Sequence, residues 1–391
     1  MSQKCVLICV PVLLEGGGTE IQVMTLIEVL IIGGYRVIVC CYYEFDQSIV
    51  ELFQRTGAET ILLGLNRFGG RFGPSKIFGL IHRLFQTFLK YHPEVVHVQY
   101  LAPGLIPIIA ARLAGVPTIF ATVHIAGSVA YGLKAKFLLR IAAYLCSAFF
   151  GVSKGVEEFW FGDSEVLDPE DPNNKRKHFT IYNAIDVDKI ERIVSDVDRE
   201  ELKRSLGITG KKVVGIVGRL APQKGHVILL DAMTEIIKQN PNVMLVAIGD
   251  GPDRGKLKDK AMQLGITQHI RWMGAMKQEE VGQLYGIMDV FVMPSLYEGF
   301  GLAAAEAMAA GLPVVGTRVD GLSEIIEDGV TGYILPVSDS HGLANVLIQM
   351  LSNPEEGEMM GQRGKDRVQK LFSLGRFNKS ILAAYDRLAR H

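Results

Sequence analysis

The chain has 391 residues, of which 48% are hydrophobic and 21% are charged, and its formal net charge is −1. This length and composition suit a globular protein of two domains, and the near-neutral charge gives no indication of a nucleic-acid partner. The cysteines form no CxxC pair and lie in or near apolar runs, which predicts buried, reduced thiols in a cytoplasmic protein. They are Cys5, Cys9, Cys40, Cys41 and Cys146.

Two apolar stretches are better explained by buried structure than by a membrane span. Residues 5–14 are short, and no small-residue cleavage site follows them, so a first buried strand fits better than a signal peptide. Residues 101–120 include Arg112 and three prolines, which disfavours a transmembrane helix. The sequence therefore predicts a cytoplasmic chain without a transmembrane segment.

Short apolar, β-branched runs alternate with longer amphipathic stretches in the first half of the chain. This alternation is typical of parallel strands joined by crossover helices. Helices are expected at Glu20–Ile32 and Lys134–Cys146, among others. The expected strands are Cys5–Val10, Arg36–Tyr42, Thr60–Leu63, Val95–Val98, Thr118–Val123, Ala148–Val152 and Phe179–Tyr182.

The polar segment Gly162–His178 interrupts the alternation, and its prolines, asparagines and basic run predict an exposed loop. The charged residues 186–205 are expected to be helical and to connect the two halves. The alternation then resumes, and a last amphipathic helix is expected at Phe377–Ala389. The strands expected in the second half are Val213–Val217, Val243–Ile248, Ile270–Trp272, Val290–Met293, Val314–Gly316 and Gly332–Leu335.

The predicted fold is α/β, with two Rossmann-like, doubly wound parallel-sheet domains in tandem. The first domain is predicted to span residues 1–185 and the second residues 186–372. The C-terminal helix, at about residues 373–391, is expected to pack back on the first domain. Such folds bind ligands at the carboxyl ends of their strands, so two facing domains are expected to form an interdomain cleft.

The segment EGFGLAAAEAMAAG, residues 298–311, follows an expected strand and opens an alanine-rich helix. Its glycines leave backbone N–H groups uncovered at the helix start, where phosphate oxygens bind favourably. The alanines at 303–305 keep the helix thin, so that a nucleotide could lie close. Glu298 and Glu306 could hold hydroxyls at the two ends of a sugar nucleotide. A capped helix with two solvated glutamates is the alternative interpretation.

The segment KKVVGIVGRLAPQKG, residues 211–225, predicts a buried strand and a following loop that carries Arg219 and Lys224. A departing diphosphate needs positive charge as its bond breaks, and Arg and Lys supply this charge without a metal ion. Two exposed basic residues without a ligand are the alternative. The later turn GDGP, residues 249–252, favours a structural role.

Taken together, these segments resemble family 4 of the retaining glycosyltransferases, which have the GT-B fold. The resemblance covers nearly the whole chain in the right order, and the combination is highly specific although each motif alone is weak. The motifs are GGGTE at 16–20, NAID at 183–186, GRL…K at 218–224, GDGP at 249–252 and EGFG…E at 298–306.

The resemblance implies a UDP- or GDP-linked sugar as co-substrate, and an acceptor bound by the amino-terminal domain. Arg219 and Lys224 would bind the donor diphosphate, and Glu298 would face hydroxyls of the transferred sugar. Glu306 would hold the ribose. Backbone amides at the helix start would bind sugar and phosphate oxygens, and these belong to Phe300, Gly301 and Leu302.

Two residues of the amino-terminal half acquire roles from the same resemblance. Gly18 would let the backbone approach the phosphate, and His124 would contact the donor sugar near the anomeric centre. The resemblance also implies retention of configuration, with the departing phosphate accepting the acceptor's proton on the same face. Arg219 and Lys224 would then matter most in the transition state.

No metal ion and no other cofactor is predicted, because the sequence contains no metal-ligand constellation with recognisable spacing. The DxD pattern of metal-dependent glycosyltransferases does occur at residues 186–188 and 196–198. Both copies lie in the charged connector, so we interpret them as solvated helix-cap residues.

Basic residues are concentrated between Thr60 and Val156, where ten of them occur with one acidic residue, Glu94. Cations beside apolar side chains suit an anionic membrane surface, each worth roughly 1 kcal/mol. We therefore predict peripheral membrane contact and a lipid-linked acceptor, with a solvated basic face or a soluble anionic acceptor as alternatives. The residues concerned are Arg67, Phe68, Arg71, Phe72, Lys76, Lys134, Lys136, Phe137, Leu138, Leu139 and Arg140.

The function predicted from the sequence is transfer of a hexosyl group to a lipid-linked or polysaccharide intermediate of cell-surface glycan synthesis. A GT-B-like sugar-nucleotide epimerase and a non-catalytic sugar-nucleotide-binding subunit are the alternatives. Nothing marks the lysine that a phosphorylase would use for pyridoxal phosphate. A dehydrogenase is disfavoured because Gly16–Gly18 is followed by Thr19 and Glu20 rather than by the GxGxxG pattern.

Overall fold

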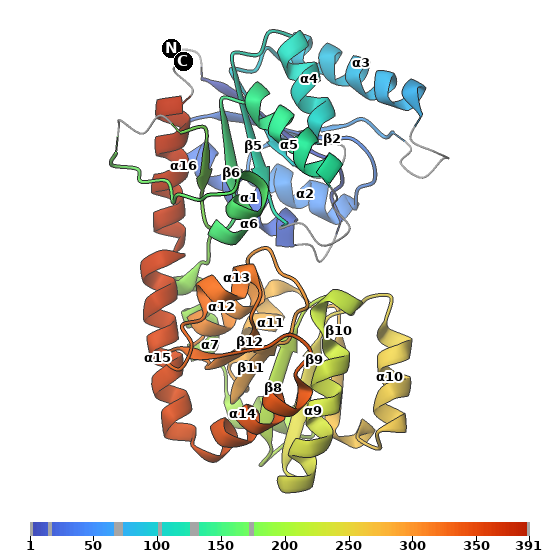
Figure 1. Ribbon diagram of the computed structural model, residues 1–391, viewed down its shortest axis with the longest axis vertical. Coiled ribbons are helices and arrows are strands. Elements are labelled where there is room, and N and C mark those ends of the chain that lie inside the picture. The colour runs from blue at the N-terminus through green and yellow to red at the C-terminus, as the bar shows by residue number, and fades with distance from the viewer. Residues whose placement is uncertain are drawn as a thin grey trace. The chain divides into compact units, whose positions relative to one another are not determined.

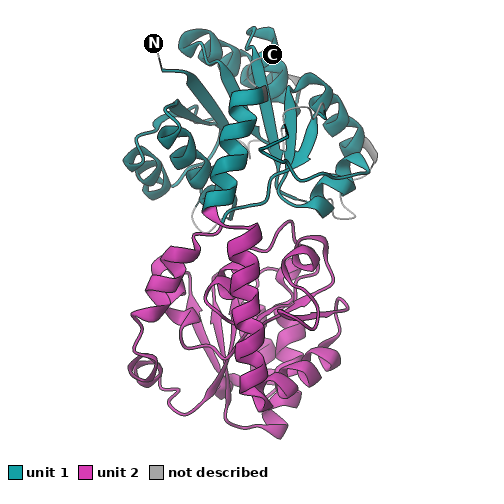
Figure 2. Cartoon of the chain, turned by 90° about the vertical axis from the view of Figure 1, so that its left-hand side faces the viewer, with its two compact units in different colours: residues 1–184, 375–391 teal, residues 185–374 magenta. Residues whose placement is uncertain are grey.

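The computed structural model describes residues 3–14, 18–65, 73–100, 104–125, 133–171 and 176–388. The chain forms two compact units, shown in Figure 2. Unit 1 comprises residues 1–184 and 375–391, and unit 2 comprises residues 185–374. Each unit contains one parallel sheet, as the alternation of apolar runs and amphipathic stretches predicted.

The sheet of unit 1 has seven parallel strands in the order β3-β2-β1-β4-β5-β6-β7 within the described residues (Figure 1). The predicted strand bounds differ from the observed ones by at most two residues, and the central strands are largely apolar because helices cover both faces. Strand order reverses between β1 and β4, which creates a topological switch point. The strands are β1 (Cys5–Val10), β2 (Arg36–Cys41), β3 (Glu59–Leu62), β4 (Val95–Gln99), β5 (Thr118–Val123), β6 (Ala148–Gly151) and β7 (His178–Thr180).

The helices of unit 1 follow the same right-handed crossover pattern on the two faces of this sheet. They are α1 (Gly18–Ile32), α2 (Gln47–Arg55), α3 (Pro74–Tyr91), α4 (Leu105–Leu113), α5 (Leu133–Leu145), α6 (Lys154–Phe161) and α16 (Leu374–Leu388). Among the helices in the described ranges, none combines the length and hydropathy that crossing a bilayer would require.

The last helix, α16, returns to unit 1 and is joined to its sheet by a buried polar chain. The hydroxyl of Tyr385 lies 2.7 Å from Nδ1 of His97, and Nε2 of the same ring lies 2.7 Å from the hydroxyl of Thr122. Burial lowers the pKa of His97 to about 3, so its ring is neutral. A neutral histidine with both nitrogens bonded thus links α16 to β4 and β5.

The predicted exposed loop between α6 and β7 is anchored from inside by Glu157, which is fully buried. Its carboxylate accepts hydrogen bonds from the hydroxyl of Thr180 at 2.6 Å and the backbone N–H of Glu165 at 3.1 Å. Nδ1 of His178 lies 2.6 Å from its other oxygen. These contacts satisfy a buried carboxylate and fix both ends of the loop.

Unit 2 contains a sheet of six parallel strands in the order β10-β9-β8-β11-β12-β13 (Figure 1). The bounds of these six strands agree with the predicted bounds to within two residues. The strands are β8 (Lys212–Val217), β9 (Val243–Ile248), β10 (Ile270–Gly274), β11 (Val290–Met293), β12 (Val314–Thr317) and β13 (Gly332–Leu335). The helical elements are α7 (Val187–Ser195), α8 (Arg199–Ser205), η1 (Pro222–Lys224), α9 (His226–Gln239), α10 (Arg254–Gln263), η2 (Thr267–His269), α11 (Gln278–Tyr285), α12 (Leu302–Ala309), α13 (Asp320–Ile325), α14 (Ser340–Ser352) and α15 (Pro354–Leu371).

One aspartate of each DxD pattern caps the start of a helix, as predicted. Asp186 caps α7 by accepting a hydrogen bond from the backbone N–H of Lys189 at 3.0 Å. Asp198 caps α8 in the same way through Glu201 N–H at 2.9 Å. A capping carboxylate satisfies an otherwise unpaired N–H and complements the helix dipole, which accounts for both patterns.

Close packing of α15 against the turn that follows α12 depends on Gly361. A Cβ atom at this position would lie 1.9 Å from the carbonyl oxygen of Gly311. We expect Gly361→Ala to lower the free energy of unfolding by about 1–3 kcal/mol, because backbone must move to admit the methyl group. The midpoint of urea denaturation measures this change.

The matched control is Gly255→Ala on α10, where an added Cβ meets nothing within 4 Å. Here alanine should leave stability unchanged or raise it by roughly 0.5–1 kcal/mol, because it favours the helix over the unfolded chain. Equal stability changes at the two positions would contradict the packing argument.

Candidate active site

The predicted donor-site residues of unit 2 lie on loops that backbone hydrogen bonds hold together at the carboxyl ends of the strands. The loop after β8 is joined to the loop after β9 by Leu220 N–H donating to Asp250 O at 3.0 Å. It is joined to the loop after β11 by Leu296 N–H donating to Gln223 O at 2.8 Å. Side chains on these loops are therefore carried by a fixed backbone.

Glycines allow these loops to approach one another closely. Gly225 has a φ of 68°, and a Cβ atom there would lie 1.9 Å from Pro294 O. Gly249, the first residue of the GDGP turn, has a φ of 130°, and its Cβ would lie 2.0 Å from Gly218 O. The turn is thus explained by packing, in agreement with the structural role predicted for it.

Lys224 and Glu298 form an ion pair that the sequence did not predict. Lys224 ends the short helix η1, and Glu298 lies on the loop between β11 and α12. The Lys224 Nζ and Glu298 Oε2 atoms are 2.6 Å apart, with side chains 21% and 16% exposed. The glutamate is therefore not simply solvated, and the pair combines a cation and a carboxylate at one point of the sheet edge.

Arg219 lies two residues after the end of β8, on the same loop as Lys224. Its side chain is exposed, and the described residues include no ion-pair partner for it. An unpaired guanidinium at the carboxyl end of a parallel strand is available to an anionic ligand.

The start of α12 is set by Gly301, which has a φ of 106° and precedes the first helical residue, Leu302. This backbone conformation disfavours any side chain, and a Cβ at Gly301 would also lie 2.6 Å from the end of the Leu322 side chain, which would have to shift. The Phe300 side chain is buried and packs edge-on against Phe372, with ring centroids 5.4 Å apart. This packing fixes the backbone from which the predicted amide donors project.

Two of the three alanines after Gly301 pack into the interior of unit 2. Ala304 and Ala305 are fully buried, so their small size serves the packing of α12 on the core of unit 2. Ala303 is half-buried. Small side chains are therefore required on the inner side of this helix.

Glu306, one turn further along α12, is half-buried. Its carboxylate accepts hydrogen bonds from the hydroxyl of Tyr285 at 3.1 Å and from Nε2 of Gln278 at 3.4 Å. Burial raises the pKa of Glu306, and these two hydrogen bonds oppose that shift. The alternative interpretation of a solvated glutamate therefore does not hold for Glu306, whose carboxylate is held by two side chains of α11.

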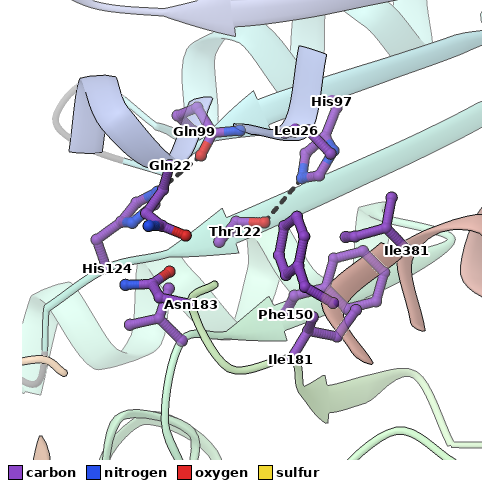
Figure 3. Close-up of a pocket in the computed structure, with 12 residues that line it drawn as sticks. Gln22, Leu26, His97, Gln99, Thr122, His124, Phe150, Ile181, Asn183 and Ile381 are labelled. Atoms are coloured by element: carbon purple, nitrogen blue, oxygen red, sulfur yellow. Dashed lines mark hydrogen bonds between the residues drawn. The ribbon is translucent and has the colours of Figure 1, made fainter. Parts of the chain in front are cut away.

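In unit 1, His124 lies just after β5, as predicted (Figure 3). Its Nε2 atom is 2.7 Å from Oε1 of Gln99, and burial lowers the pKa of His124 to about 4. The ring is therefore neutral near neutral pH. With Oε1 as the acceptor, the proton of the neutral ring lies on Nε2, and Nδ1 carries the lone pair.

A small cavity of about 30 Å³ lies beside His124, enough for about two water molecules (Figure 3). Polar and apolar side chains from the sheet, α1 and α16 line it. They are Gln22, Leu26, His97, Gln99, Thr122, His124, Phe150, Val152, Ile181, Asn183, Phe377 and Ile381. This space is too small for a sugar ring.

Gly18 is the first residue of α1 and is exposed. The preceding residues of the glycine loop, 15–17, lie outside the described residues. One turn into α1, the side-chain amide of Gln22 exchanges hydrogen bonds of 2.9 and 3.1 Å with the backbone of Ala184. Gln22 thereby ties α1 to the NAID segment.

Sequence reasoning missed several of these side chains. In β4, VVHVQ places His97 and Gln99 at alternate positions of an otherwise apolar strand, and this pattern was a usable signal for a polar site under a helix. Tyr285 gave no such signal, because a tyrosine at the end of an amphipathic helix is common in cores.

Among the described residues, no group of three or more His, Cys, Asp or Glu side chains could hold a metal ion.

Two family models match the chain, one mainly on each unit. The model "Glycosyltransferase Family 4" matches residues 16–189, and "Glycosyl transferases group 1" matches residues 198–367. With both halves matched in order, the chain belongs to the family 4, group 1 glycosyltransferases.

Curated relatives are similar over part of their length. N-acetyl-alpha-D-glucosaminyl L-malate synthase of Bacillus anthracis is 32% identical over 208 residues, which are 53% of this chain and 52% of the relative. The lipopolysaccharide core biosynthesis mannosyltransferase LpsB of Rhizobium meliloti is 30% identical over 218 residues, or 54% of this chain and 61% of the relative. The chain thus spans just over half the length of these relatives.

Solved structures resemble the chain over nearly its full length. HepE of Anabaena, crystallised with UDP and glucose, has a TM-score of 0.77 and 21% identity, covering 96% of this chain and 97% of that chain. The two parallel-sheet units and this likeness give the chain the GT-B fold that was predicted.

Three histidines, of which His97 and His226 are buried and His124 is half-buried, predict how stability depends on pH. Burial lowers the pKa of His97 to about 3 and those of His124 and His226 to about 4, from an ordinary value of 6.5. Between these values the unfolded chain binds more protons than the folded one. The free energy of unfolding should therefore fall as pH is lowered from 6.5 toward 4, by up to about 1.4 kcal/mol per pH unit for each histidine.

Urea denaturation at several pH values in this window measures the slope. The variant His97→Gln should reduce it, whereas the same substitution of the exposed His82 should not. An unchanged slope in His97→Gln would contradict the assignment of a neutral, buried ring.

Proposed function

We propose that the chain is a retaining glycosyltransferase that moves a hexosyl group from a UDP- or GDP-linked donor to an acceptor hydroxyl. The observation that carries the proposal is the Lys224–Glu298 pair at the sheet edge, with Arg219 exposed on the same loop. This arrangement offers cations to a diphosphate and a carboxylate to sugar hydroxyls. The family and the UDP and glucose bound to HepE support it.

In this proposal the departing diphosphate is stabilised by fixed cations. Breaking the bond between the sugar and the phosphate oxygen leaves negative charge on that oxygen, and Arg219 and Lys224 interact with the charge as it forms. Because the charge is larger in the transition state than in the bound donor, these residues act more on turnover than on affinity. The cations supply the stabilisation, so the proposed reaction requires no metal ion or other cofactor.

Donor binding requires the Lys224–Glu298 pair to exchange partners. The two groups are 2.6 Å apart in the free site, and both are mostly buried. A diphosphate would take the ammonium group, and sugar hydroxyls would donate to the carboxylate. A complete donor thus compensates both charges, whereas a nucleoside diphosphate alone leaves Glu298 without its partner.

The proposal gives His124 and Gly18 roles in unit 1. The neutral ring of His124, held at Nε2 by Gln99, would present Nδ1 as a hydrogen-bond acceptor for a hydroxyl of the donor sugar. Gly18, at the exposed start of α1, would let backbone approach the phosphate. The departing phosphate would accept the acceptor's proton on the same face, which accounts for retention.

We further propose that the acceptor is a lipid-linked or polysaccharide intermediate of cell-surface glycan synthesis, reached at the cytoplasmic face of the membrane. Helix α3 exposes Phe78 and Leu89, and the helix contains basic but no acidic residues. On α5, which likewise lacks acidic residues, Phe137 and Tyr144 are 66% and 79% exposed. Exposed apolar side chains among cations suit an anionic membrane surface.

Parts of the basic segment lie outside the described residues. They are residues 67–72 and the side chain of Lys134. Lys136, which is described, lies over the ring of Phe159 with Nζ 4.4 Å from its centroid. The membrane proposal therefore rests on α3 and α5.

The transfer activity predicts a sharp response to two substitutions. Lys224→Ala and Glu298→Ala should each lower turnover by about two to three orders of magnitude, because each removes one charge from the transition-state site and leaves the other unpaired. Release of nucleoside diphosphate from a panel of UDP- and GDP-sugars, with candidate acceptors and with or without a chelator, measures the rate.

The control is Lys256→Ala on α10, where the lysine side chain is 84% exposed. Near-normal rates in both site variants would contradict the assignment. An epimerase would convert the sugar nucleotide without net release of diphosphate, and a non-catalytic subunit would leave it unchanged. A rate abolished by the chelator would contradict metal independence.

Membrane contact predicts charge-dependent binding to lipid vesicles. The wild-type chain should co-sediment with anionic vesicles more than with neutral ones. Reversing Arg83 and Lys90 on α3 to Glu should weaken the binding at least about tenfold, at roughly 1 kcal/mol for each cation. Equal binding to both vesicle types, or none, would refute the proposal. The substitution Ile32→Ser on α1, at a side chain that is 78% exposed, is the control.

A further inference from the structure

Glu306 lies in surroundings that a simple hydroxyl-binding role does not explain. It projects from the second turn of α12 and is half-buried. Burial favours the neutral form of its carboxyl group and raises its pKa. A carboxylate that accepts hydrogen bonds from a ligand has to be ionised and oriented, so its neighbours must offset the burial.

The two carboxylate oxygens have different neighbours, both supplied by α11. Oε2 accepts a hydrogen bond of 3.1 Å from the hydroxyl of Tyr285, whose side chain is 2% exposed. Oε1 lies 3.4 Å from Nε2 of Gln278, whose side chain is exposed. The two residues are seven positions apart and so share one face of the helix. Oε2 is therefore held by a buried hydroxyl, and Oε1 contacts the amide of an exposed side chain.

Tyr285 can act only as a donor toward Glu306. Burial and the neighbouring carboxylate raise the pKa of its phenol well above the ordinary value of 10, so the proton remains in place. The ring packs edge-on against Phe291 of β11, with centroids 5.9 Å apart. The hydroxyl is thus a fixed donor, carried by a side chain with no room to turn away.

We propose that Tyr285 is a positioning residue for nucleotide recognition, which holds Oε2 of Glu306 so that Oε1 accepts hydrogen bonds from the ribose hydroxyls. The ribose displaces Gln278, whose 3.4 Å contact is long and easily exchanged with solvent. The inference rests on the proposed function, since it takes a nucleotide ribose as the ligand of Glu306.

The test compares nucleoside diphosphates with and without the ribose hydroxyls. Isothermal titration gives the Kd of the wild type and of Tyr285→Phe for UDP, GDP and their 2′,3′-dideoxy forms. Tyr285→Phe should weaken binding of the preferred ribonucleotide about tenfold, as expected for a lost hydrogen bond to a charged group. Its Kd for the dideoxy form should change less than about twofold, because that ligand does not use Glu306.

Three further variants separate positioning from a merely structural effect. Tyr333→Phe on β13 makes the same chemical change elsewhere in unit 2 and should leave both Kd values unchanged. Glu306→Gln should abolish the ribose preference by itself, so the comparison stands even if Tyr285→Phe fails to fold. Gln278→Ala should keep or strengthen the preference, because the ribose takes the place of that contact.

The outcomes distinguish this inference from the function on which it rests. If the wild type binds no nucleoside diphosphate, the proposed function fails. If it binds the ribose and dideoxy forms equally, the ribose role of Glu306 fails while the function stands. If Tyr285→Phe weakens both forms equally or neither form, or if Gln278→Ala loses the ribose preference, the positioning role alone is overturned.

Discussion

The structure of unit 2 depends on the close approach of three loops at the carboxyl edge of its sheet. Backbone hydrogen bonds join the loops after β8, β9 and β11, and Gly225 lies against Pro294 O where a Cβ atom would be 1.9 Å away. This contact brings the loop of Lys224 to the loop of Glu298. The ion pair between them follows from backbone packing, and a site carried by backbone is organised before any ligand arrives.

The close approach of these loops also explains why the positive charge of Lys224 and the negative charge of Glu298 are paired in the ligand-free site. A lysine and a glutamate buried to this degree would each be costly alone, and their pairing at 2.6 Å removes most of that cost. A ligand that separates them has to compensate both. The ligand-free ion pair therefore favours a molecule that carries an anion next to hydroxyl groups. An anion alone would compensate only Lys224, and a sugar alone would compensate only Glu298.

The sequence predicted the sheets well because buried parallel strands and crossover helices have strong local periodicity, and it predicted the helix caps at Asp186 and Asp198 for the same local reason. The motifs also marked the loops that form the candidate site. It did not predict which side chains meet. Lys224 and Glu298 are 74 residues apart, and His97 and Tyr385 are 288 apart, so no local pattern connects them. Polar residues at alternate positions of β4 were the one local sign of such a contact.

The buried contact between His97 and Tyr385 joins the C-terminal helix α16 to the sheet of unit 1. Tyr385 holds His97, His97 holds Thr122, and Thr122 lies two residues before His124, which follows the end of β5. Gln99, two residues after His97 on β4, holds His124 itself. The ring proposed to meet the donor sugar is thus held by Gln99, and the chain of Tyr385, His97 and Thr122 lies on the neighbouring positions of the same two strands. Without α16 the network would lose a partner, and His97 would be left with an unsatisfied nitrogen beneath the site.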